Sequence, residues 1–169
     1  MDTRPPDHRL PTRVISGGQT GVDRAALDAA KAAAIPIGGW CPAGRTAEDG
    51  PIPSEYPLRE TASRDYSKRT RLNVRDADAT LILHRGPIAG GTALTADYAA
   101  ELGRPLLLVN LDTALTTASV TAWLEQNQVQ VLNVAGPRES TSPGIAAMAA
   151  AFLRRLFSAI PDHPEDEAR

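Results

Sequence analysis

Two glycine-rich turns carry the pattern best suited to ligand chemistry in this 169-residue sequence. The first, SGGQTGVD, contains Gly17, Gly18 and Gly21, and the second, IAGGTALTAD, contains Gly90 and Gly91. Because glycine has no side chain, the backbone of such a turn can approach a ligand closely, and the first amides of the following helix have no partner within that helix. A helix start also carries partial positive charge, so each turn predicts a site for a phosphate or another oxyanion.

Each turn also has a plainer interpretation. The first could be a tight strand-to-helix connection without a ligand, and in the second Thr92 could simply cap a helix. The first turn lacks the Gly-Lys-Ser/Thr ending of a nucleoside-triphosphate loop. The next predicted strand ends in Trp40 and Cys41, where a dinucleotide-binding fold places an acidic residue. Asp23 would repel an anion unless it faces away or accepts a hydrogen bond from the ligand, yet two such turns together favour a phosphate-bearing ligand.

A long loop and a polar helix add further polar side chains. The Gly- and Pro-rich loop over residues 41–61 contains Arg45 and Glu48, and a loop this long in a compact domain is usually functional or disordered. The helix predicted from Ser63 to Asp76 places Asn73 on its inner side, where the amide needs a backbone or ligand partner. Arg69 lies one turn earlier and can share a surface with Asn73.

The elements that would position these residues alternate between strand and helix. Apolar runs predict strands near 13–16, 35–40, 79–83, 105–111 and 129–136. Helical spacing predicts helices from residue 22, over 63–76, from residue 92 with Leu94, Tyr98 and Leu102 facing inward, over 116–128 and over 143–159. Strands that are apolar throughout and alternate with helices predict an α/β domain with a mainly parallel sheet covered on both faces. Ligands on such sheets bind beyond the carboxyl ends of the strands, and both glycine turns follow a strand.

Composition narrows the class of protein. A net charge of −2 gives no general attraction to nucleic acid or to anionic membranes. No segment approaches the roughly 20 apolar residues that cross a bilayer, and the N-terminus lacks the apolar core of a signal peptide, so we expect a cytoplasmic protein. Residues 1–12 and the acidic tail 161–169 are expected to be disordered, which leaves 13–160 as a single domain. Cys41 is the one cysteine, the histidines are scattered, and neither a metal site nor a firm catalytic residue is predicted.

Five segments, in order, resemble the molybdenum (molybdenum-cofactor) carrier proteins. These are ISGGQTGVDRAALDAA, GGWCPAGRTAEDGPIPSEYPLRET, SKRTRLNVRDADATLIL, GGTALTADYA and NVAGPRESTSPGI. The carrier proteins in turn look like members of a Rossmann-like superfamily that includes the cytokinin-activating nucleoside-monophosphate phosphoribohydrolases. The resemblance covers about residues 13–159. It implies a doubly wound sheet of about five or more strands, a pocket for a phosphorylated heterocycle, and assembly into homodimers or homotetramers.

The resemblance also implies roles for individual residues. The ligand would be the molybdenum cofactor, a pterin with a terminal phosphate, or a similar molecule, held without turnover and passed to an apo-molybdoenzyme. Anion contacts in the first turn would come from Gly17, Gly18, Gln19, Thr20 and Gly21. Those in the second would come from Gly90, Gly91, Thr92 and Thr95. The remaining matches to family positions near the pocket are Arg45, Glu48, Arg69 and Asn73.

Two other functions stay open. The phosphoribohydrolases carry Pro-Gly-Gly-x-Gly-Thr-x-x-Glu, in which the glutamate serves hydrolysis. This sequence has Thr95 at that position, with Asp97 and Glu101 out of register. In a nucleoside 5′-monophosphate phosphoribohydrolase-like enzyme, Glu48 and Arg45 would be the catalytic candidates. A nucleotide-sensing module, which binds nucleotides without turnover, is the third possibility.

Overall fold

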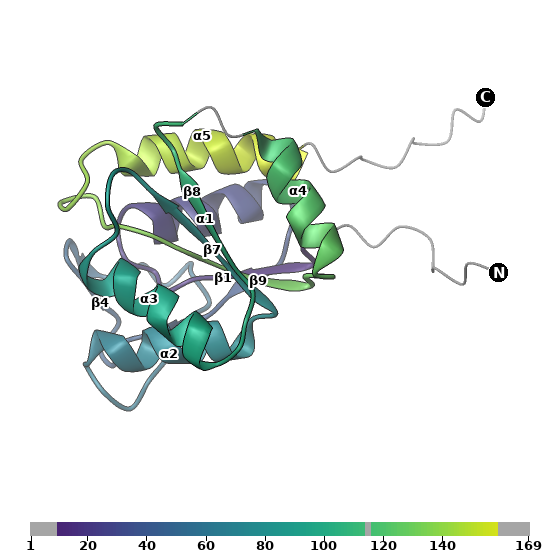
Figure 1. Cartoon of the computed structure of the whole chain (residues 1–169). Coiled ribbons are helices and arrows are strands. Elements are labelled where there is room, and N and C mark those ends of the chain that lie inside the picture. Colours follow the sequence, from purple (N-terminus) through teal and green to yellow (C-terminus); the bar gives the residue numbers. More distant parts are fainter. Residues whose placement is uncertain (1–9, 114–115, 159–169) are drawn as a thin grey trace, which may run out of the picture.

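A parallel sheet of five strands forms the centre of the molecule in a computed structural model that describes residues 10–113 and 116–158 (Figure 1). The strands lie in the order β2–β1–β9–β7–β8. Their bounds are β1 Arg13–Ile15, β2 Ile37–Gly38, β7 Ala79–His84, β8 Leu106–Asn110 and β9 Val131–Ala135. Every pairing within this sheet is parallel, which confirms the predicted α/β fold. The segments 1–12 and 161–169, for which disorder is predicted, lie outside the described residues except for 10–12.

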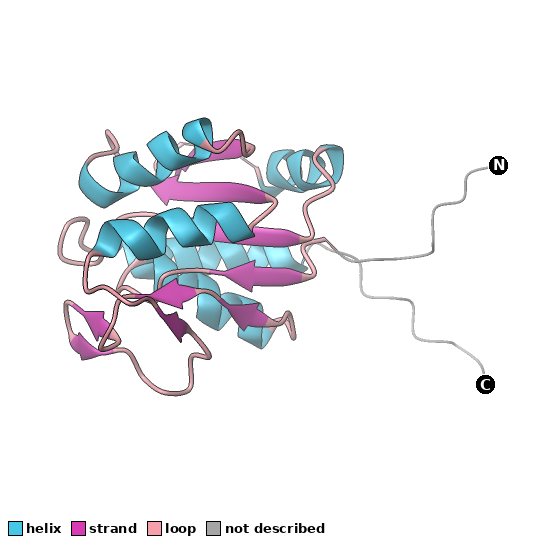
Figure 2. Ribbon diagram, turned by 90° about the horizontal axis from the view of Figure 1, so that it is seen from below, coloured by secondary structure: helices cyan, strands magenta, loops and turns pink. Residues whose placement is uncertain are grey.

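Within residues 10–113 and 116–158, five helices cover the two faces of the sheet. Helices α1 (Val22–Ala32), α4 (Thr117–Gln126) and α5 (Ile145–Ser158) lie on one face, and α2 (Tyr66–Asp76) and α3 (Gly90–Glu101) lie on the other (Figure 1). Figure 2 shows the strand arrows of the sheet pointing in the same direction, so their carboxyl ends share one edge. Because β9 lies between β1 and β7, the turns that follow these three strands are neighbours at that edge.

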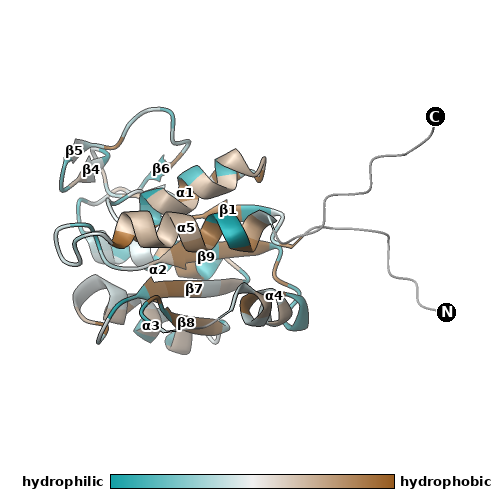
Figure 3. Cartoon of the chain, turned by 90° about the horizontal axis from the view of Figure 1, so that it is seen from above, coloured by the Kyte–Doolittle hydropathy of each residue, from teal (hydrophilic) through white to brown (hydrophobic). Residues whose placement is uncertain are grey.

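The two faces of the sheet differ in polarity. Alternate strand residues such as Leu81, Leu132 and Val134 are fully buried in the main core, together with α1, α4 and α5, and Figure 3 shows apolar strands beneath α1 and α5. The residue between Leu132 and Val134 is Asn133, which lies on the opposite face because successive strand residues point to opposite sides. The face that α2 and α3 cover therefore carries polar groups.

The loop over residues 41–61 has structure of its own. Within it, β3 (Trp40–Cys41) pairs in parallel with β6 (Arg59–Glu60), and β4 (Thr46–Ala47) forms an antiparallel hairpin with β5 (Gly50–Pro51). A second apolar cluster lies beneath the loop and consists of Leu27, Cys41, Ile52, Tyr56 and Leu58. Burial of this cluster fixes the loop against α1.

Three predicted details are wrong. The strand predicted over 35–40 divides at Gly39, where a Cβ would lie 2.2 Å from the Ser16 carbonyl oxygen and φ is +129°. Helix α2 begins at Tyr66 rather than at Ser63, because Asp65 caps it and its side chain accepts a hydrogen bond from the amide of the second helical residue (2.9 Å). In α3 the predicted inward stripe of Leu94, Tyr98 and Leu102 is only half-buried, while the buried residues are the smaller Thr92, Thr95 and Ala99.

Replacing Gly136 with alanine is expected to destabilise the fold by about 1–3 kcal/mol. The new Cβ would lie 2.2 Å from the Leu83 carbonyl oxygen and 2.6 Å from a methyl of Val22, and this backbone contact cannot relax cheaply. Urea denaturation of Gly136→Ala measures the loss. The matched control is Gly91→Ala, whose Cβ meets nothing within 4 Å and should leave stability equal or slightly higher. Equal stabilities of the two variants would contradict the packing argument.

Candidate functional site

A cavity of about 520 Å³ lies at the carboxyl edge of β1, β9 and β7, on the side of α2 and α3. Five segments line it: the turn after β1, helix α2, the segment from β7 into α3, strand β9, and the loop that follows β9. Of the predicted ligand-binding residues, the cavity brings together Gly17, Gln19, Arg69, Asn73, Gly90, Gly91, Thr92 and Thr95. Outside its lining lie Gly18, Thr20, Gly21, Arg45 and Glu48.

The two glycine turns differ in what surrounds them. In the first, protein atoms fill the space beside every glycine: a Cβ would lie 1.4 Å from Nη1 of Arg69 at Gly17, 2.5 Å from Leu58 at Gly18, and 2.3 Å from the Pro137 carbonyl oxygen at Gly21. In the second turn, a Cβ at either glycine meets nothing within 4 Å. The glycines of the first turn thus allow other segments to pack closely, whereas the start of α3 is open to a ligand.

Asp23 and Arg69 form a buried ion pair in the wall of the cavity. Nη1 of Arg69 donates to Oδ2 of Asp23 at 3.0 Å, and the backbone amide of Gln19 donates to the same oxygen at 3.2 Å. The Asp23 residue is 5% exposed, and this burial raises its pKa above the ordinary range, while Arg69 partly offsets the rise. The carboxylate that could repel an anion is therefore paired with an arginine.

Two buried asparagines line the cavity, one from helix α2 and one from strand β9. Asn73 has the backbone partner that its inward position requires, because it accepts from the Trp40 amide at 2.8 Å and donates to the Trp40 carbonyl at 3.0 Å. Asn133, which the sequence reasoning missed, is 3% exposed and donates to Thr80 Oγ1 at 3.3 Å. The sequence does contain a sign of it. A single asparagine inside the apolar strand VLNVA is a buried amide that needs a hydrogen-bond partner, as an inward Asn on a helix does.

Two further arginines, also missed, line the cavity. Nε of Arg85 donates to Asp112 Oδ1 at 2.9 Å, and Nε of Arg138 lies 3.6 Å from Oε2 of Glu48. Arg85 directly follows β7, and Arg138 lies in the loop after β9. Because ligands of such sheets bind beyond the carboxyl ends of the strands, both positions could have been predicted. Arg69, Arg85 and Arg138 are thus each paired with one carboxylate. A guanidinium group has five N–H donors, so each arginine keeps donors that could bind a ligand.

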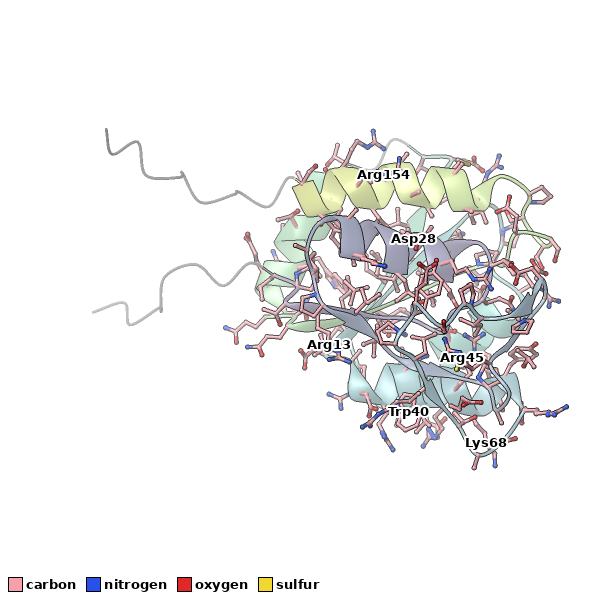
Figure 4. The ribbon with its side chains drawn as sticks, turned by 180° about the vertical axis from the view of Figure 1, so that it is seen from behind. Arg13, Asp28, Trp40, Arg45, Lys68 and Arg154 are labelled. Carbon is pink, nitrogen blue, oxygen red and sulfur yellow. The ribbon has the colours of Figure 1, made fainter. Side chains whose placement is uncertain are left out.

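Arg45 and Glu48 hold the long loop in place. The Arg45 guanidinium donates to four backbone carbonyls of the loop, at 2.8–3.2 Å (Figure 4). Glu48 accepts hydrogen bonds from the hydroxyls of Thr20 and Ser140 and from the Ser140 amide, so it ties the β4–β5 hairpin to the turn after β1 and to the loop after β9. These bonds hold the pKa of Glu48 below its ordinary value.

Residues 14–157 match the model of the circularly permutated YpsA SLOG family. The chain belongs to this family. A solved structure from Syntrophus aciditrophicus, named "Putative molybdenum carrier protein", is 44% identical and has a TM-score of 0.84, with 90% of this chain and 98% of that chain covered. This likeness confirms the resemblance that the sequence motifs indicate. A search of curated proteins finds no match.

No helix within 10–113 and 116–158 is long and apolar enough to cross a membrane. The same ranges contain no cluster of three or more His, Cys, Asp or Glu side chains placed to hold a metal ion. Cys41 is fully buried, and burial raises the pKa of its thiol.

Acidification is expected to loosen the β4–β5 hairpin. Because the folded-state pKa of Glu48 lies below the unfolded value of about 4.3, its stabilising effect is present above that value and is lost as the pH falls through the folded-state pKa. Hydrogen-exchange protection of residues 46–51 should therefore fall below about pH 4, and Glu48→Gln should show reduced protection already at neutral pH. As a control, Glu55→Gln removes only an exposed 3.9 Å pairing with Lys31. Undiminished protection in Glu48→Gln would refute the role of this carboxylate.

Proposed function

We propose that this protein binds a phosphorylated heterocyclic molecule and carries it without turnover, and that the molybdenum cofactor is this cargo. The observation that carries the proposal is the start of α3. Gly90 and Gly91 face open space there, inside a cavity that Arg69, Arg85 and Arg138 also line. The 44% identity to a protein named as a molybdenum carrier supports the choice of cargo.

The phosphate of the ligand would lie at the start of α3. Backbone amides in the first turn of a helix donate to phosphate oxygens, and the helix dipole favours negative charge at that end. Arg85 lies between β7 and α3 and lines the same cavity. Its guanidinium group can therefore donate a charge-assisted hydrogen bond to the phosphate. Such a site needs only amides and one or two arginines to hold a dianion.

The heterocycle would lie deeper in the cavity, against α2 and β9. Tyr66 and Thr70 line one side and Asn133 the other, and an amide can pair with both donors and acceptors of a pterin or purine ring. A volume of about 520 Å³ is ordinary for a small-molecule site. Shape and chemistry thus agree with one ligand that spans both regions.

Holding the ligand is favoured over cleaving it. Thr95, at the position of the phosphoribohydrolase glutamate, donates its hydroxyl to the Gly91 carbonyl at 2.9 Å. Among the described residues that line the cavity, Asp23 is the one acidic side chain, and it is engaged by Arg69. Homodimer or homotetramer formation, and delivery to an apo-molybdoenzyme, remain predictions from the sequence resemblance.

Equilibrium dialysis against the molybdenum cofactor, under anaerobic conditions, tests the proposal. Gly91→Asp places a carboxylate at the second residue of α3, and this charge should weaken binding at least roughly tenfold, equivalent to about 1.4 kcal/mol. The matched control is Ala118→Asp, at the exposed second residue of α4 outside the cavity, which should bind as the wild type does.

Parallel incubations with nucleoside monophosphates separate the alternatives. Release of ribose 5-phosphate would establish a phosphoribohydrolase, and nucleotide binding without turnover would favour a sensing module. If Gly91→Asp and wild type retain the cofactor equally, the start of α3 is not the site.

A further inference from the structure

The cavity carries more positive charge than one phosphate at the start of α3 requires. Arg69 lies beside Gly17, directly after β1, whereas α3 follows β7, and β9 separates these two strands. Neighbouring strands are about 4.8 Å apart, so the ends of β1 and β7 lie two strand spacings apart, on the order of 10 Å. One phosphate is smaller than this separation between the two strand ends.

The Arg69 guanidinium is held but not fully hydrogen-bonded. Asp23 accepts from Nη1, and the guanidinium carbon lies 5.6 Å from the centre of the Tyr66 ring. Nε, in contrast, is buried and has no hydrogen-bond partner among the described residues. A buried donor without an acceptor is unfavourable, so an acceptor that reached this edge of the guanidinium group would be bound well.

The guanidinium group of Arg69 occupies the space that a side chain at position 17 would fill. Any Cβ there would collide with Nη1 and Cζ and would lie 2.9 Å from Oδ2 of Asp23. Because Gly17 has no side chain, the planar group can lie in the wall of the cavity with Nη1 held by Asp23. The Nε and Nη2 donors lie on the other edge of the group and form the parallel pair that suits two oxygens of one oxyanion.

From this geometry we infer that Arg69 and Asp23 form a second oxyanion subsite in the cavity. The subsite takes a tetrahedral or oxo-metal oxyanion, the chemical class of molybdate, sulfate and phosphate. The inference deepens the proposed function, because it assigns a second anionic group of the cargo to the β1 end while the phosphate lies at α3. Arg69 contacts the oxyanion, and Asp23 acts as a positioning residue.

The position of Asp23 gives the subsite a distinct pH dependence. The groups that face its carboxylate are Arg69 from α2, the Gln19 amide from the turn, and the Ser16 hydroxyl directly after β1. An oxyanion beside Arg69 disfavours the ionised form of Asp23, so binding is coupled to proton uptake and tightens as the pH falls. Asparagine at position 23 preserves an oxygen acceptor for Arg69 but removes both the charge and this coupling.

Calorimetric titration of the full chain with sodium sulfate, and separately with sodium molybdate, tests the subsite. Sulfate does not titrate near neutral pH, so any pH dependence comes from the protein. We expect two anions per wild-type chain, of which Arg69→Gln loses one and Gly91→Asp the other. Asp23→Asn should tighten binding at the Arg69 subsite roughly threefold or more and flatten its pH profile. Arg69→Lys, which keeps the charge but loses the fork, should bind with intermediate affinity.

Two further variants keep the test decisive. Arg69→Gln leaves Asp23 buried without its cation, so the double variant Asp23→Asn with Arg69→Gln provides a neutral pair in case the single variant fails to fold. Lys68→Gln, on the exposed side of α2 (Figure 4), is the charge-matched control and should retain both anions. If the double variant folds and still binds two anions with wild-type affinity, Arg69 is only structural and the inference is overturned.

The outcome is separable from that of the proposed function. Oxyanion binding that depends on Arg69, together with no retention of the molybdenum cofactor, would leave the subsite standing and remove the proposed cargo. Cofactor retention that is lost in Gly91→Asp but unchanged in the double variant would support the proposed cargo and remove the Arg69 subsite.

Discussion

The ion pair between Asp23 and Arg69 joins the start of α1 to the middle of α2. A buried carboxylate requires a cation, and Asp23 finds one 46 residues later in the sequence, on a helix that packs against the opposite face of the sheet. The guanidinium passes over the end of β1, so position 17 must be glycine. Through this contact the turn after β1, the start of α1 and the middle of α2 are set relative to one another. The wall of the cavity follows from that placement.

The unequal faces of the sheet explain why the cavity lies where it does. Leucine and valine fill the space beneath α1, α4 and α5, whereas Asn133 and Thr80 occupy the face toward α2 and α3. Small buried residues on α3, such as Thr92 and Ala99, do not fill the remaining volume. The same chain therefore builds one tightly packed layer and one polar, partly open layer that contains the cavity.

Much of the fold can be predicted from sequence because strand and helix patterns are local. The alternation of apolar runs with helical spacing is enough for the parallel sheet and for the gathering of both glycine turns at one edge. The site is harder, since the reason for a residue often lies far away. Gly17 and Gly18 have the composition of an anion cradle, but Arg69, Leu58 and Ile52 fill their space. Arg45 stands in a motif that resembles a binding site, but it bonds to loop carbonyls, and only the folded loop shows which carbonyls are within reach.

The pairing of β1 with β9 determines when the cavity can form during synthesis of the chain. These neighbours join the two ends of the domain: the Ser16 hydroxyl, at the end of β1, donates to the Val134 carbonyl across 118 residues of chain. Until β9 has left the ribosome, the middle of the sheet is missing, and with it Asn133 and the loop that carries Arg138. A nascent chain consequently has no completed cavity until this part of the domain has been synthesised.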